Sequence, residues 1–218
     1  MGFKESPKRV LIIAPQPFYE DRGTPIAVRH VVTALSQLGW RVDILTYAVG
    51  EDLALPGVRI FRFGAWLRFR SIPIGFSLKK LLLDIMLPAA ILRRLFTDSY
   101  DCMHAVEEAI YPALWLRPFF KVPVIYDMQS SIADQLALHP YLRFLRPGRL
   151  ANWFEKKAYC RADAVVCSVG LAQKYLNEGR ATRAREWVFP DTFEELTNID
   201  PVLIRQEFEI PASRIAIE

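Results

Sequence analysis

Cysteine and histidine are both scarce in this sequence. No two of the three cysteines have the Cys-x-x-Cys spacing, so they are typical of reduced thiols in a cytoplasmic protein rather than of a disulfide framework. The three histidines lie too far apart in the sequence for a zinc pattern, and we predict no metal site. These residues are Cys102, Cys160 and Cys167, and His30, His104 and His139.

Long apolar runs are also missing. The segment Met1–Arg9 is short and polar and has none of the features of a signal peptide. No uncharged stretch reaches the roughly 20 residues that a membrane span needs. The nearest one, Leu81–Phe96, is interrupted by Asp84, Pro88 and two arginines. We therefore expect a cytoplasmic protein.

The composition is that of a globular chain. Of the 218 residues, 52% are hydrophobic and 24% are charged, which excludes a disordered protein and predicts a substantial core. The net charge of +4 suits an anionic ligand or an anionic membrane surface, and it is too small to require nucleic acid as a partner. There are no internal repeats.

Apolar runs alternate with helical patterns along most of the chain. An open parallel sheet with helices on both faces, a Rossmann-like α/β fold, is the architecture that such alternation predicts. Thr24 is expected to cap the first helix, and Pro88 to break the second. We expect strands at 9–15, 41–47, 58–63, 100–105, 123–127, 164–168 and 187–190, and helices at 25–38, 76–96, 108–119, 131–139, 147–161 and 171–179.

The end of the chain suggests a second unit. Asp200 and Pro201 have the pattern of a helix start, and Arg214–Glu218 has the pattern of a buried strand. We interpret residues 1–198 as one lobe and residues 199–218 as a crossover followed by the start of another lobe. The alternative is that Arg214–Glu218 is an edge strand of the same sheet.

The loop after the first strand is the first candidate site. In open parallel sheets ligands bind outside the carboxyl ends of the strands. Gly23 would let the backbone approach a ligand, and the free N–H groups of the following helix start, near Thr24, favour a phosphate. A single glycine satisfies neither the Gly-x-Gly-x-x-Gly pattern of dinucleotide binding nor the phosphate loop. A plain turn before a capped helix remains the alternative.

Polar residues also follow two later strands. His104 and Glu107 come at the end of one, and Asp127, Gln129 and Ser130 at the end of the next. Each could serve an acceptor site. Each also has a structural interpretation: a hydrogen-bonded core histidine, acidic residues at a helix start, and a helix-capping network. No acid–base pair can be assigned from spacing, so the catalytic residues stay unknown.

A third feature mixes basic and aromatic residues. Trp66, Arg68 and Arg70 are followed by Lys79 and Lys80. Such mixtures suit the interface of an anionic bilayer, whereas the alternative is a core helix preceded by an irregular loop.

The ordered set of motifs resembles the N-terminal domain of family 4 glycosyltransferases, which have the two-lobed GT-B fold. The similarity runs from Val10 to about Glu218. It includes Leu-Gly-Trp-Arg-Val-Asp-Ile-Leu-Thr ending at Thr46, Asp-Cys-Met-His-Ala ending at Ala105, and Arg-Ala-Asp-Ala-Val-Val-Cys-Ser ending at Ser168. The last of these is the most specific match.

This resemblance implies retaining transfer from a nucleotide-sugar, without a metal or other cofactor. It implies that this lobe holds the acceptor, a glycan or lipid-linked group in cell-envelope synthesis, while the loop containing Gly23 approaches the donor phosphates. Most of the donor site would lie in a second lobe, so this lobe alone is expected to be inactive. The loop sequence Arg22-Gly23-Thr24 replaces the two adjacent glycines common in the family, and Arg22 becomes an acceptor-binding candidate. Gln129 stands where the family commonly has a histidine, and an amide cannot act as a base.

Three functions therefore remain open. The first is the acceptor lobe of a glycosyltransferase. The second is a non-catalytic sugar- or nucleotide-binding or interaction module with the same fold. The third is a sugar-nucleotide epimerase, which shares the two-lobed fold.

Overall fold

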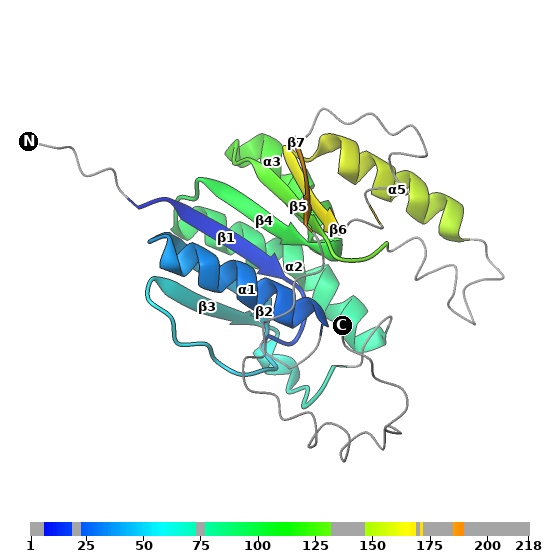
Figure 1. Ribbon diagram of the computed structural model, residues 1–218. Coiled ribbons are helices and arrows are strands. Elements are labelled where there is room, and N and C mark those ends of the chain that lie inside the picture. Colours follow the sequence, from blue (N-terminus) through cyan, green and yellow to red (C-terminus); the bar gives the residue numbers. More distant parts are fainter. Residues whose placement is uncertain are drawn as a thin grey trace, which may run out of the picture.

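The computed structural model describes residues 7–18, 23–72, 77–131, 147–168, 171 and 185–189. Its centre is a seven-stranded sheet with the order β3-β2-β1-β4-β5-β6-β7, in which every neighbouring pair is parallel (Figure 1). This arrangement confirms the predicted Rossmann-like α/β fold. The strands are β1 (Arg9–Ala14), β2 (Arg41–Tyr47), β3 (Val58–Phe63), β4 (Cys102–Val106), β5 (Val124–Met128), β6 (Ala164–Ser168) and β7 (Arg185–Phe189).

The central strand β1 is buried because helices cover both faces of the sheet. Leu11, Ile12 and Ile13 have no exposed surface, as its continuous apolar sequence predicts. Ile12 is in register with Ile44 of β2 on one side and with His104 of β4 on the other. That register brings the carboxyl ends of β1, β2 and β4 to the same edge of the sheet.

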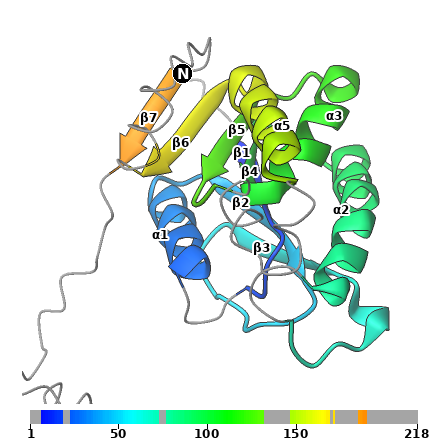
Figure 2. The same ribbon diagram turned by 90° about the vertical axis from the view of Figure 1, so that its right-hand side faces the viewer.

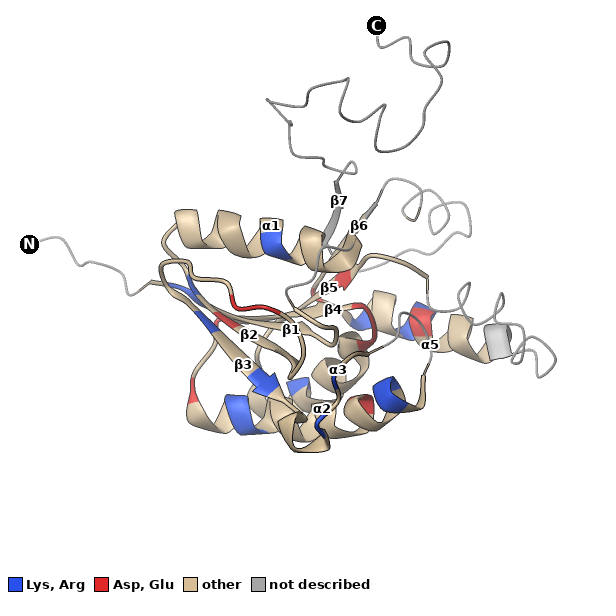
Figure 3. Ribbon diagram, turned by 90° about the horizontal axis from the view of Figure 1, so that it is seen from below, with Lys and Arg blue, Asp and Glu red and all other residues tan. Residues whose placement is uncertain are grey.

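The described helices divide unequally between the two faces. Helix α1 (Gly23–Gln37) covers one face, and α2 (Leu78–Thr97), α3 (Ile110–Phe120) and α5 (Pro147–Arg161) lie on the other (Figures 2 and 3). Short 3-10 helices occupy Ala65–Leu67 and Glu107–Ala109. Each face has its own apolar cluster, with Val28 and Val32 of α1 in one and Leu87 and Ile91 of α2 in the other.

Several predicted boundaries differ from the structure. Helix α1 begins at Gly23, so Thr24 lies inside the helix and is not its N-cap. Pro88 does not break α2, which runs without interruption from its N-cap Ser77 to Thr97. Burial of Leu83, Leu87, Ile91 and Leu95 on one face outweighs the roughly 3 kcal/mol cost of an interior proline. The remaining strands and helices shift by two residues or fewer, and the predictions for 132–139, 172–179 and 199–218 lie outside the described residues.

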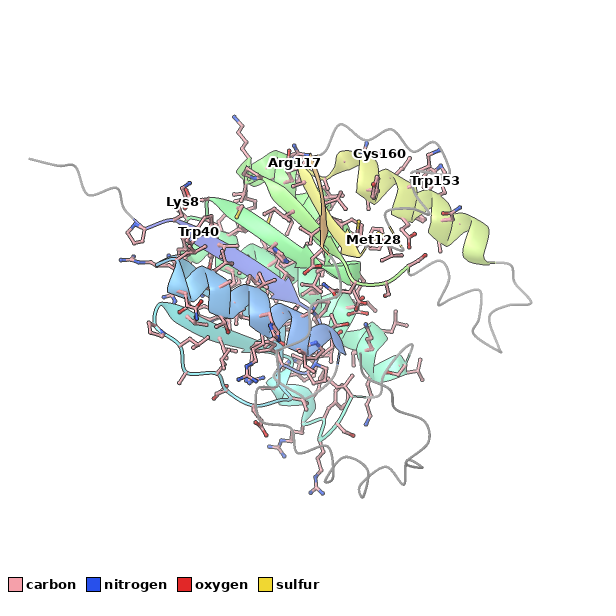
Figure 4. The ribbon with its side chains drawn as sticks, viewed as in Figure 1. Lys8, Trp40, Arg117, Met128, Trp153 and Cys160 are labelled. Atoms are coloured by element: carbon pink, nitrogen blue, oxygen red, sulfur yellow. The ribbon has the colours of Figure 1, made fainter. Side chains whose placement is uncertain are left out.

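An ion-pair network closes the amino edge of the sheet. The Asp43 carboxylate, 1% exposed, accepts hydrogen bonds from the Arg9 and Arg59 guanidinium groups at 2.7–2.8 Å and from the Tyr100 hydroxyl at 2.7 Å. Lys8 lies over the Trp40 ring at the same edge, whereas Met128 marks the carboxyl end of β5 (Figure 4). The charge of Asp43 is thus balanced by arginines from β1 and β3, with a further hydrogen bond from Tyr100 just before β4, as a buried carboxylate requires.

Candidate active site

Helix α1 starts at the carboxyl edge of the sheet, and the role of its first turn toward a phosphate stays a prediction. Its first residue, Gly23, does not have a left-handed backbone, and a Cβ added there would meet nothing within 4 Å. Packing within this lobe therefore does not require glycine at position 23. The first turn of α1 contains no acidic residue, so no carboxylate of the helix itself would repel an anion or take up the N–H groups of that turn.

The ends of β4 and β5 bring three predicted residues into one hydrogen-bonded group. His104 Nε2 lies 2.8 Å from Asp127 Oδ2, and Gln129 Nε2 donates to Asp127 Oδ1 at 2.6 Å. His104 and Asp127 are 6% and 1% exposed, whereas Gln129 is only half-buried. Asp127 therefore orients both neighbours, and Gln129 is the member of the group that can reach a ligand.

A second pair joins the same two strand ends. The Ser130 hydroxyl donates to Glu107 Oε1 at 2.7 Å. Glu107 has a left-handed backbone with φ of 50°, which is uncommon for a residue with a side chain. Burial and the neighbouring Glu108 raise the pKa of the Glu107 carboxyl, against the opposing effect of the Ser130 hydrogen bond. Strain and an unfavourable charge at one residue are typical of a functional position.

A further acidic group lies beside this pair and comes from helix α2. The Tyr47 hydroxyl donates to Asp84 Oδ1 at 2.7 Å, and Lys80 forms an ion pair with Glu108. Burial, reinforced by Glu108, raises the pKa of Asp84 to about 6. Burial lowers the pKa of Lys80, but the charge of Glu108 and its hydrogen bond outweigh that effect and the net shift is upward.

Asp84 and Tyr47 are absent from the residues predicted by sequence. In the sequence, Asp84 is a single charge within the apolar run of α2, and Tyr47 is the last residue of the buried strand β2. Neither position by itself indicates a site. The spacing of Lys80 and Asp84, four residues apart on one helix face, is the pattern that could have indicated them.

Arg62 of β3 holds together the loops that follow β1 and β2. Its guanidinium donates to the carbonyl oxygens of Phe18 at 2.7 Å and Glu51 at 2.6 Å, and more weakly to those of Tyr47 and Val49. Gly50 has φ of 117°, and a Cβ there would lie 2.2 Å from the Phe18 carbonyl oxygen. These contacts hold Phe18, shortly after the end of β1, against the segment that follows β2.

Gln16 is the polar side chain of the same loop. Its backbone carbonyl accepts a hydrogen bond from Thr46 Oγ1 at 2.6 Å. Its side-chain amide nitrogen is buried and has no hydrogen-bond partner among the described residues. A buried donor left without a partner is costly in a protein, so Gln16 is an additional candidate for contact with a ligand.

The structure thus places most of the predicted acceptor residues at one edge. His104, Glu107, Asp127, Gln129 and Ser130 form two hydrogen-bonded groups there. Arg22 lies outside the described residues. Their roles toward a substrate stay predictions.

Four of the predicted membrane-surface residues are exposed. Trp66, Arg68, Arg70 and Lys79 are all open to solvent, and Trp66 is 71% exposed. Lys80 differs, because it is half-buried and its ammonium faces Glu108. We therefore assign Lys80 to the acidic group at the carboxyl edge and not to the exposed basic set.

Two features are absent from the described parts of the chain. None of the helices described there is long and apolar enough to cross a membrane. Within the same residues, no three or more histidine, cysteine or acidic side chains gather in a way that could hold a metal ion.

Solved structures share this fold. Sucrose-phosphate synthase from Thermosynechococcus elongatus superposes with a TM-score of 0.69 at 18% identity over 94% of this chain and 53% of that one. A shorter structure of the same synthase gives a TM-score of 0.60 at 17% identity, covering 93% of this chain and 97% of that one. Arabidopsis thaliana UGT89C1 complexed with UDP-L-rhamnose gives 0.50 at 12% identity, covering 94% and 55%. The chain thus spans about half the length of the first synthase structure.

No curated protein sequence matches the chain. The model of one family, described as the glycosyl transferase 4-like domain, matches residues 22–191. That stretch includes α1, the strand ends that carry His104 and Asp127, and the described strands from β2 to β7. This chain therefore belongs to the glycosyl transferase 4-like domain family and has the fold of the N-terminal lobe of a GT-B glycosyltransferase.

Proposed function

We propose that this chain is the acceptor-side lobe of a retaining glycosyltransferase that moves a hexose from a nucleotide-sugar to a glycan or lipid-linked acceptor in cell-envelope synthesis. Family membership supports sugar transfer. The observation that carries the proposal is the pair of hydrogen-bonded groups at the ends of β4 and β5, in which Gln129 and Ser130 are half-buried and Asp127 and Glu107 hold them in place. Oriented amides and hydroxyls of this kind recognise sugar hydroxyl groups.

The donor phosphates would meet the start of α1. The open space around Gly23 supports this role, because the glycine is explained by a ligand approaching the backbone and not by packing within the lobe. The structure of UGT89C1 contains UDP-L-rhamnose, a nucleotide-sugar. We propose a donor of the same class here, held mainly by a second lobe across the cleft, with no metal or other cofactor.

The test is turnover by the longest protein that the gene encodes, incubated with a panel of nucleotide-sugars and glycan or glycolipid acceptors. Product with the anomeric configuration of the donor would support the proposal. Saturable nucleotide-sugar binding without any product, even with acceptor present, would instead support a non-catalytic binding module. Conversion of the nucleotide-sugar in the absence of acceptor would indicate an epimerase.

Gly23→Val tests the donor-facing role of α1. The branched side chain has room in the isolated lobe, so the melting temperature should stay within about 2 °C, while kcat/KM should fall at least tenfold because the side chain intrudes on the donor phosphates. Ala34→Val is the matched control, since Ala34 is exposed three turns further along the same helix. Equal loss of activity in the two variants would show that α1 has no special role at its start.

We further propose that the protein works at the cytoplasmic face of a membrane. Arg68 and Arg70 of the exposed basic set follow Trp66 closely in the sequence, and Lys79 lies over the Phe69 ring. Lys79 belongs to α2, which also exposes Leu78, Leu81, Leu82 and Ile85 to solvent. Basic residues next to exposed apolar side chains favour anionic lipid headgroups over neutral ones.

Co-sedimentation with vesicles tests this location. Binding to vesicles that contain about a third anionic lipid should weaken at high salt and fall at least tenfold when Arg68, Arg70 and Lys79 are changed to glutamate. Arg41 and Arg161, exposed at the amino edge of the sheet, provide a control substitution of the same sign. Equal binding to neutral vesicles would argue against a basic membrane face.

A further inference from the structure

A groove lies between helices α2 and α3, next to the candidate site and separate from the polar set that the proposed function uses. Its cavity volume is about 400 Å³, within the range of small-molecule sites. The walls are apolar and come from two packed helices: Leu87 and Pro88 of α2, and Tyr111, Pro112 and Trp115 of α3. A site on two helices that pack on the same sheet is pre-formed, which reduces the entropy cost of binding.

The groove has a polar end. Asp84 and Glu108 line it there, with Tyr47 of β2 bonded to the Asp84 carboxylate and Lys80 of α2 paired with Glu108. Two carboxylates against one ammonium leave this end anionic. A phosphate, sulfate or carboxylate would be repelled, whereas hydroxyl groups could donate hydrogen bonds to the carboxylate oxygens.

The position of the polar end links the groove to the acceptor residues. Glu108 directly follows Glu107, whose carboxylate accepts the Ser130 hydrogen bond. Trp115, at the other end of the groove, is 64% exposed although it is a large aromatic residue. A molecule lying along the groove would thus have its hydroxyl-bearing end near Ser130 and its apolar end against Trp115.

We propose that this groove binds the apolar aglycone of the acceptor, as part of a neutral amphiphile whose hydroxyl-bearing head lies at Asp84 and Glu108. This inference rests on the proposed function, because it specifies the class of acceptor for the same site. It excludes an acceptor with an anionic group directly beside the apolar chain.

Calorimetry with monomeric octyl β-D-glucoside, below its micelle concentration, provides the first test. We expect saturable one-to-one binding to the chain, with glucose and octyl sulfate each binding at least tenfold more weakly. Trp115→Ala should weaken octyl glucoside binding roughly tenfold, because it removes one apolar wall. Trp66→Ala is the matched control, since Trp66 is equally exposed but does not line the groove, and its binding should not change.

A photoreactive octyl glucoside provides a second readout, which maps the binding site directly on the parent chain. Labelled peptides should come from α2 and α3 at the groove. Labelling that spreads over the exposed face of α2 and falls with Trp66→Ala would overturn the proposal, because it would show adsorption to a surface. Octyl sulfate binding as tightly as octyl glucoside would overturn it as well.

Transfer assays with the longest encoded protein separate this inference from the proposed function. If sugar is transferred to soluble glycans and Trp115→Ala leaves kcat/KM for octyl glucoside and for maltose equally unchanged, the groove proposal fails and the transferase proposal stands. If octyl glucoside binds in the groove and no nucleotide-sugar is turned over, the transferase proposal fails. A rise in KM for octyl glucoside alone, with kcat retained, is the result that we expect.

Discussion

Asp84 offers a direct test of the electrostatics at the carboxyl edge. Its carboxyl is partly buried between Tyr47 and the Lys80–Glu108 pair, and burial followed by the charge of Glu108 raises its pKa from 3.8 to about 6. Asp84→Asn keeps an oxygen that can accept the Tyr47 hydrogen bond and removes the titrating charge. The variant should therefore be more stable than the parent chain at neutral pH.

The sign and size follow from the two pKa values. Below about pH 4, Asp84 is protonated in both the folded and the unfolded chain, so its favourable contribution is fully present. As the pH rises toward 6, the unfolded chain releases the proton and the folded chain retains it, so the stability of the parent falls. Each tenfold change in proton affinity is about 1.4 kcal/mol, and the total loss is at most about 3 kcal/mol.

Urea unfolding of the parent and of Asp84→Asn at intervals from pH 4 to pH 8 measures this difference. The free energy of unfolding of the variant, minus that of the parent, should increase by about 2–3 kcal/mol between pH 4 and pH 7 and then level off. Glu51→Gln serves as the control, because Glu51 is an exposed carboxylate, and its difference should stay within about 0.5 kcal/mol. A flat difference for Asp84→Asn would refute the environment inferred for this carboxyl.

Three further substitutions test the supports of the site, each by urea unfolding with retention of the circular dichroism spectrum as the check on folding. Arg62→Met should cost about 2–4 kcal/mol, because several carbonyl oxygens lose a charged donor, and a cost below about 1 kcal/mol would contradict its role in joining the loops. Gly50→Ala should cost at least about 2 kcal/mol, because the added methyl collides with the Phe18 carbonyl at a left-handed position, and a neutral effect would show that this loop moves freely. Asp43→Asn should cost about 3–5 kcal/mol, because it leaves two guanidinium groups without their buried carboxylate. A stabilised variant would contradict the inference that this carboxylate stabilises the amino edge of the sheet.

Much of the fold could be predicted from sequence because its elements have local causes. The apolar runs of β2 and β3 predict strands with the bounds that the structure has, and α5 likewise matches its predicted range. Pro88 shows where local rules fail. The free-energy cost of a proline inside a helix is set by the backbone. Whether the helix nevertheless continues through Pro88 depends on how much apolar surface of α2 is buried against the sheet.

The candidate site was predictable as a set of residues but not as an arrangement. Strand ends indicate His104, Asp127 and Gln129 individually, since ligands bind at that edge of parallel sheets. That Asp127 bonds both of the others depends on the β4–β5 register, which no spacing within one strand reveals. The role of Lys80 could not be foreseen either, because its partner Glu108 lies 28 positions away on another element.

The two ends of the sheet differ in how their charges are balanced. At the amino end the buried Asp43 is matched by arginines, and at the carboxyl end Asp84, Glu107 and Glu108 share Lys80. A library that varies only the carboxyl end would therefore leave the scaffold's main electrostatic anchor intact. Variants selected for a different acceptor can carry substitutions at the carboxyl end, because removing the charge of one carboxylate there reduces its repulsion with the other two. Substitutions around Asp43 at the amino end should instead destabilise the fold. In this lobe, substitutions at the carboxyl end should therefore reduce stability less than substitutions at the amino end.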